Sequence, residues 1–193
     1  MFLVFKSRLP RAGKYDNVEK TAGRCYPHEK ANHDLPRRVF AVRAARIVGE
    51  EDLIAKARQE INLAEADSIQ MVIAGKSAAG HDAQLFWFIT GNEYQAQRPH
   101  PIEFTALGGD AYKFVKTYHP IPRGQDIYAL LWRDGYSFCV NNPDCKTIRI
   151  TDNAGVTEIP VTEYPFVCYS ALPPYDALYF EYLFLDGDGN EIR

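Results

Sequence analysis

The sequence predicts an α+β fold that is mainly antiparallel β-structure, with one well-defined helix and a strand-rich, sandwich-like C-terminal third. Three observations support this class. Apolar and polar residues alternate with a period of two along most of the 193 residues. A single segment, residues 50–66, repeats apolar residues at helical spacing. The alternating strands and helices of a doubly wound nucleotide-binding fold are missing from the pattern, which argues against that fold.

The N-terminal quarter of the chain is predicted to hold two strands, 2–8 and 38–48, joined by a long loop over residues 10–37. Loops of this length in compact domains are usually functional or disordered. Basic residues alternate here with tyrosine and histidine, a combination suited to holding phosphate groups or an acidic protein surface. A solvated loop, or one paired with acidic residues of the same fold, is the alternative interpretation. The candidate anion-binding residues are Lys14, Lys20, Arg24 and Lys30.

The charge of the chain is unevenly distributed. Residues 1–48 contain eleven Lys and Arg against four Asp and Glu, whereas the remaining residues contain eleven against twenty-one. The formal net charge of −3 therefore combines a basic first quarter with an acidic remainder. Because the whole chain is acidic and has no zinc-finger or RNP motif, we do not expect it to bind nucleic acid.

The predicted helix over residues 50–66 follows Gly49. Its first turn is acidic, which suits the positive end of the helix dipole. Its apolar residues form one narrow stripe that predicts docking against a sheet. The acidic residues are Glu50, Glu51 and Asp52, and the stripe consists of Leu53, Ala57, Ile61 and Ala64.

The residues after the helix are predicted to be strands joined by turns. The Gly, Ser and Ala residues of 75–80 indicate a flexible loop, and Pro99 and Pro101 are expected to break a connection between strands. The dipeptide Asp134-Gly135 between two apolar runs predicts a hairpin. The predicted strands are Ile69–Ala74, Gln84–Thr90, Ile102–Leu107, Tyr112–Tyr118, Ile127–Trp132, Tyr136–Val140, Thr147–Thr151, Val156–Val161, Phe166–Tyr169 and Leu178–Leu185.

The length predicts a single domain over residues 1–193. Pro120, Pro122 and Gly124 indicate a rigid linker, so residues 119–125 are the candidate boundary between two subdomains. No stretch approaches eighteen apolar residues, so we expect no membrane span. The first residues also lack the basic and apolar regions of a secretory signal, from which we predict a cytoplasmic protein.

Several groups of residues resemble parts of metal or catalytic sites. Cys25, His28 and His33 have half of a zinc-site spacing. Cys139 and Cys145 flank a turn, where they would complete such a cluster, form a local disulfide or pack as reduced thiols. The pair His81-Asp82 suggests a general base, but neighbouring residues on a strand point to opposite faces. We therefore predict no metal and no cofactor, and the sequence assigns no catalytic residue.

The C-terminal part is acidic and aromatic. Residues 151–193 contain eight Asp and Glu against one Arg, and residues 164–184 contain eight aromatic side chains. Surfaces rich in tyrosine are favoured at protein interfaces because the ring offers a large area at a low entropy cost. The alternative is that these rings pack a β-sandwich. The candidate partner-binding residues are Glu163, Tyr175, Asp176, Tyr179, Glu181 and Tyr182.

Two functional hypotheses follow from these features. The first is a non-enzymatic protein-binding protein of the immunity or inhibitor type, whose acidic aromatic surface meets a basic protein partner. The second is an enzyme that acts on a phosphate-bearing or nucleotide-like ligand, with the loop 10–37 as a lid. A pocket between residues 10–37 and 75–82 would favour the enzyme.

Overall fold

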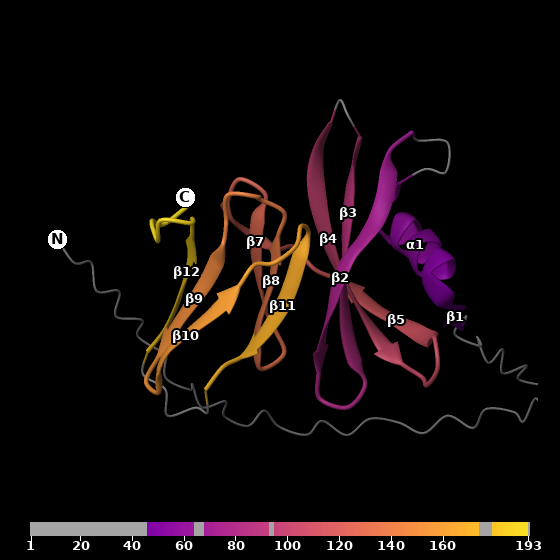
Figure 1. Ribbon diagram of the computed structural model, residues 1–193. Coiled ribbons are helices and arrows are strands. Elements are labelled where there is room, and N and C mark those ends of the chain that lie inside the picture. Colours follow the sequence, from indigo (N-terminus) through magenta and orange to yellow (C-terminus); the bar gives the residue numbers. More distant parts are fainter. Residues whose placement is uncertain (1–45, 64–67, 93–94, 174–178, 193) are drawn as a thin grey trace, which may run out of the picture. The chain divides into compact units, whose positions relative to one another are not determined.

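The computed structural model describes residues 46–63, 68–92, 95–173 and 179–192 (Figure 1). All of them belong to one compact unit, Val42–Arg193. The predicted strand 2–8, the loop 10–37 and most of the predicted strand 38–48 lie outside the described residues.

The predicted fold class is confirmed: the described residues form one helix and three antiparallel sheets. The helix is α1 (Gly49–Glu60). Sheet A has the order β1 (Ile47–Val48), β5 (Ala111–Thr117), β4 (Gln95–Ala106), β3 (Ala83–Asn92) and β2 (Gln70–Ala79). Sheet B has the order β11 (Phe166–Ala171), β8 (Gly135–Val140), β7 (Ile127–Trp132) and β6 (Ile121–Gly124). Sheet C has the order β10 (Gly155–Pro160), β9 (Thr147–Asp152) and β12 (Phe180–Leu185).

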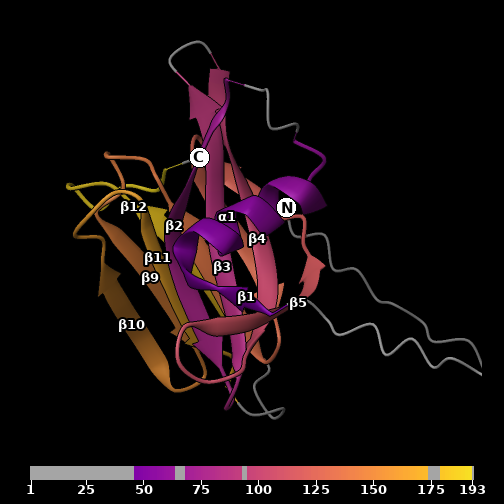
Figure 2. The ribbon, with the colours of Figure 1, turned by 90° about the vertical axis from the view of Figure 1, so that its right-hand side faces the viewer.

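Helix α1 covers one face of sheet A (Figure 2). Its stripe residues Leu53 and Ala57 are buried, and the Asp52 carboxylate accepts a hydrogen bond of 3.1 Å from the Val48 N–H at the helix start. The helix ends at Glu60 rather than at residue 66. Asn62 adopts a left-handed conformation with a φ of 55°, which terminates the helical backbone.

The prediction of a flexible loop at residues 75–80 is wrong. Strand β2 continues to Ala79, with a bulge between Ile73 and Gly75. A Cβ atom on Gly75 would lie 2.8 Å from the Cβ of Val167 in β11. The small residues therefore allow close packing between strands of sheets A and B, and they do not mark a loop.

The prediction that Pro99 and Pro101 interrupt a connection between strands is also wrong, because both lie within β4. They are opposite Ile89 and Trp87 of β3. The Pro101 carbonyl accepts a hydrogen bond of 2.9 Å from the Tyr118 N–H. The backbone groups of Pro101 therefore point towards β5 and away from β3. β5 ends at Thr117, so the missing N–H groups of the two prolines remove no bond between strands.

The segment 119–125 connects β5 to β7 and contains the short strand β6, which pairs with β7. The expected linker is therefore partly a strand, whereas the single domain and its candidate boundary stay predictions. The predicted hairpin is confirmed: Arg133 and Asp134 form a two-residue turn between β7 and β8. A Cβ on Gly135 would lie 2.4 Å from the Ser170 carbonyl oxygen, so glycine is needed there.

Three hydrophobic clusters hold together the helix and the three sheets that are drawn in Figure 1. The first lies between α1 and sheet A, and it includes Phe86, Phe88 and Phe104. The second joins the other face of sheet A to sheet B, and the third joins sheet B to sheet C. The central strands of sheet B, β7 and β8, are consequently buried on both faces and have few exposed positions. The predicted sandwich-like C-terminal third corresponds to sheets B and C.

Candidate functional site

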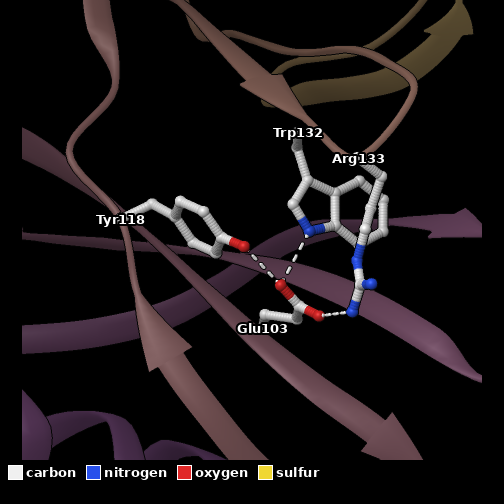
Figure 3. A network of polar contacts seen from close by, with 4 residues as sticks. All are labelled: Glu103, Tyr118, Trp132 and Arg133. Atoms are coloured by element: carbon white, nitrogen blue, oxygen red, sulfur yellow. Dashed lines mark hydrogen bonds and ion pairs between the residues drawn. The ribbon is translucent and has the colours of Figure 1, made fainter. Parts of the chain in front are cut away.

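A buried carboxylate lies between sheets A and B (Figure 3). Glu103 of β4 is only 1% exposed. Its Oε2 accepts hydrogen bonds from the Tyr118 hydroxyl and, at 3.0 Å, from the Trp132 indole N–H. Its Oε1 forms an ion pair with the Arg133 guanidinium, whose side chain is half exposed. Both carboxylate oxygens are thus engaged by groups that favour the ionised form.

The electrostatics of this group agree with its geometry. Burial alone would raise the pKa of Glu103, but hydrogen bonds from Tyr118 and Trp132 and the adjacent Arg133 outweigh it and lower the pKa. The pKa of Tyr118 is raised by burial and by its bond to the Glu103 carboxylate. With its carboxylate ionised and fully paired, the group has no proton to transfer and joins the two sheets.

A second polar group lies at the same interface. The Ser77 and Ser137 hydroxyls are 2.8 Å apart, and the Trp87 indole N–H donates to the Ser137 hydroxyl at 2.7 Å. Each sheet therefore contributes one tryptophan whose N–H bonds to an acceptor on the other sheet. Both serines are buried, and their mutual hydrogen bond satisfies them without a ligand.

The described cysteines do not form a disulfide or a nucleophilic site. Cys139 and Cys145 are buried free thiols that lie in different hydrophobic clusters, on opposite faces of sheet B. The alternative of a local disulfide across the turn is therefore wrong, and the two side chains pack as reduced thiols. Burial raises the pKa of Cys139 to about 12 and also raises that of Cys168 to about 12, so neither thiol ionises readily.

The described histidines are not arranged as general bases beside an acid. His81 and Asp82 are exposed in the turn between β2 and β3. His100 Nε2 lies 2.7 Å from the Thr90 hydroxyl, and its pKa is lowered by burial and by Arg98 and His119. Within the described ranges, no three His, Cys, Asp or Glu side chains are close enough to hold a metal ion. Cys25, His28 and His33 lie outside those ranges.

A cavity of about 290 Å³ lies where sheet A extends past the end of β8. Its polar lining consists of three carboxamides and a phenol, and no charged side chain contributes. The Tyr164 hydroxyl already donates to the Cys145 carbonyl at 2.7 Å. This lining offers no acid, base or nucleophile for catalysis. The lining residues are Gln70, Val72, Ile89, Gly91, Gln97, Asn141, Tyr164 and Pro165.

The predicted partner-binding residues are distributed over two faces of sheet C. Tyr179 is 48% exposed, and its hydroxyl donates to the Glu181 carboxylate beside it. Glu163 is exposed after β10. Tyr182 instead lies on the inner face and packs against the cluster between sheets B and C. Tyr175 and Asp176, with the anion-binding candidates Lys14, Lys20, Arg24 and Lys30, lie outside the described residues.

Reasoning from the sequence did not identify Glu103. In the run Ile102-Glu103-Phe104 the glutamate resembles the solvent-facing residue of a half-buried strand. The two tryptophans and the nearby tyrosine were the available signal, because a buried indole N–H usually requires an acceptor.

Comparison of the chain with models of known protein families, with curated protein sequences and with solved structures found no match. The one helix in the described part of the chain, α1, is too short and too polar to cross a membrane.

Proposed function

We propose that the protein is a non-enzymatic protein-binding protein, of the immunity or inhibitor type, that holds a basic partner on the outer surface of sheet C. We define the sheet C surface by Tyr179, Glu181, Glu163 and the exposed strand β10. Cytoplasmic localisation, predicted from the sequence, is part of the same proposal.

The main support is the chemistry of this surface. Exposed acidic side chains lie along this surface, with Tyr179 beside Glu181, and strands β9, β10 and β12 contribute Arg149 as their one basic side chain. Arg149 is held by Glu158, with a distance of 2.8 Å between Nη2 and Oε1. A negative surface of this kind attracts a basic protein and raises the rate of encounter.

The candidate groups for catalysis give further support. In the described residues, the buried carboxylate is fully paired, the buried thiols are un-ionised and the described histidines have no acid partner. The enzyme hypothesis depends on residues 10–37, which lie outside the described ranges, and on residues 75–82, which form the end of β2 and a turn. No described contact favours it.

The proposal is tested by identifying the partner and measuring its association rate. The tagged full chain is used for affinity capture from the native host, and the stoichiometric protein is then purified. The double variant Glu163→Lys, Glu181→Lys should associate about tenfold more slowly because it reverses the charge that attracts the partner. Raising the salt concentration should screen this charge and lower the association rate of the unmodified protein towards that of the double variant.

Two lysine substitutions outside sheet C, Asp82→Lys together with Asp110→Lys, provide the matched control. Asp82 is exposed in the turn between β2 and β3 and Asp110 in the turn between β4 and β5, and together they make the same change of charge. We expect this control variant to associate nearly as fast as the unmodified protein. Equal rates for the sheet C double variant and the unmodified protein, or capture of no stoichiometric protein, would contradict the proposal.

A further inference from the structure

Within the described part of the chain, strand β10 forms one edge of sheet C and pairs only with β9 (Figure 2). The Val161 N–H donates to the Lys146 carbonyl at 2.9 Å, which continues the register of the two strands. In an antiparallel pair the backbone groups of alternate residues point to the same side. The backbone groups of residues 155, 157 and 159 therefore face β9, whereas those of Val156 and Glu158 face away from the sheet.

The free edge of β10 offers a strand-shaped set of hydrogen-bonding groups. Val156 and Glu158 each present an N–H and a C=O, and Pro160 presents a C=O. No backbone hydrogen bond among the described residues reaches these groups. Pro160 lies at an outward position, where its missing N–H costs no bond to β9. Along the strand, Val156 is 62% exposed and Ile159 is the one residue that is not fully exposed.

Other edges of the described sheets have features that discourage strand addition. β2 has a bulge, the unpaired part of β4 contains two prolines, and β12 uses its Phe184 carbonyl to accept the Ile192 N–H at 2.8 Å. Between Val156 and Ile159, β10 has no proline, lysine or bulge. Its charged residue, Glu158, bonds to Arg149 through Oε1, and its side chain remains 54% exposed. β10 is thus the unprotected member of this set of edges.

We infer that β10 binds its partner by strand addition: a basic strand of another protein extends sheet C. This inference rests on the proposed function and specifies how the partner is held. Backbone bonds at Val156 and Glu158 would supply affinity, and alternate side chains would supply specificity. An apolar side chain fits beside Val156, and a Lys or Arg fits beside the Glu158 carboxylate. Two copies of this chain joined at β10 would bring their acidic residues together, which disfavours self-association.

The test uses synthetic six-residue peptides, which match the length of β10. They alternate valine with lysine in either order, and matched peptides carry glutamate in place of lysine. Hydrogen exchange is measured by NMR on the full chain. The lysine peptides should slow exchange of the Val156 and Glu158 amides about tenfold, because these amides become hydrogen-bonded. The Thr157 amide, already bonded to β9, should not change.

Two variants separate the backbone from the side chain. Val156→Pro removes the outward N–H and should weaken peptide binding about fivefold, as expected for one lost hydrogen bond. Val156→Ala keeps that N–H and should weaken binding less. Thermal unfolding of each variant checks that the fold is kept, and the exchange measurement on the unmodified protein needs no variant.

The outcomes distinguish this inference from the proposed function. Strand addition would be overturned if no lysine peptide slowed the exchange of either amide. It would also be overturned if the glutamate peptides slowed exchange as much as the lysine peptides. Protection that depends on protein concentration without peptide would indicate a second copy instead and would also overturn it. The charge-reversal experiment decides the proposed function separately, since a captured partner can bind the acidic surface without pairing with β10.

Discussion

The two faces of sheet B are held to their neighbours by different chemistry. Towards sheet A, the Glu103 carboxylate and the Ser137 hydroxyl each accept a hydrogen bond from an indole. Towards sheet C, the contact consists mainly of rings: Tyr136 stacks on Phe180 with centroids 5.2 Å apart, and Phe138 meets Tyr182 edge-on at 5.0 Å. One interface depends on directional bonds, whereas the other depends on apolar area.

This difference has a consequence for how each interface tolerates change. Hydrogen bonds to a buried charge require one geometry, so loss of a partner leaves an uncompensated polar group. Aromatic clusters accept side chains of similar volume with small adjustments. The interface between sheets A and B should therefore respond strongly to chemically small substitutions. The interface between sheets B and C should respond mainly to a loss of volume.

The largest expected effect follows from Glu103→Ala. The substitution leaves the Trp132 N–H and the Tyr118 hydroxyl without their acceptor, and it should lower the free energy of unfolding by about 3–5 kcal/mol. Chemical denaturation measures it. The near-isosteric Glu103→Gln should cost less, about 1–3 kcal/mol, because its carbonyl still accepts one bond. A loss below 1 kcal/mol for Glu103→Ala would contradict a structural role of the carboxylate.

The contribution of Glu103 should depend on pH. Its pKa in the folded protein lies below the ordinary value of 4.5. The ionised carboxylate therefore stabilises the fold above pH 4.5, and this stabilisation is lost as the pH falls through the lower folded pKa. Urea unfolding at several pH values should show a constant difference between the unmodified protein and Glu103→Gln near neutrality. The difference should narrow in acid, and a difference independent of pH would disprove the ionised state.

The hairpin between β7 and β8 contributes Arg133 to the Glu103 network. It should tolerate no side chain at Gly135, the first residue of β8. A Cβ in Gly135→Ala would meet the Ser170 carbonyl at 2.4 Å and the Tyr169 ring at 2.6 Å. Because the first contact is with backbone, the strand must shift, which should cost about 1–3 kcal/mol. Thermal unfolding measures the loss. Gly187→Ala, whose Cβ would meet nothing closer than 3.9 Å, is the matched control and should change stability little.

The smallest effect is expected for Phe138→Leu at the interface between sheets B and C. Phe138 is fully buried among rings of β8 and β12. Leucine keeps most of the apolar volume, so the loss should be about 1–1.5 kcal/mol and independent of pH. Chemical denaturation of Phe138→Leu and of Glu103→Gln compares the loss in free energy of unfolding for two changes that keep most of the side-chain volume. A larger loss for Phe138→Leu than for Glu103→Gln would reverse the proposed difference between the interfaces.

The sequence predicts the helix and the hairpin at Arg133 because each depends on local pattern. It fails where tertiary packing decides. Pro99 and Pro101 are compatible with a strand because β5 ends before reaching them, and Gly75 lies in a strand because β11 crosses closely. Neither fact is local to these residues. The anion-binding candidates lie outside the described residues and stay predictions.

The candidate site was partly accessible from the sequence. Composition indicates an acidic, aromatic C-terminal part, and both interpretations of its rings apply: Tyr182 packs inside the sandwich, whereas Tyr179 is exposed. Alternation cannot tell which strand ends a sheet, because pairing joins residues that are distant in the chain. The free edge of β10 is therefore visible only in the structure, where the order of the strands is known.

The central claim is that sheet C, and not sheet A or helix α1, binds the partner. Hydrogen exchange of the full chain, measured with and without the captured protein, tests it most directly. We expect slower exchange at the amides of Val156 and Glu158 and no change along α1 or β2. Protection along α1 or β2, with exchange in β10 unaltered, would contradict the claim.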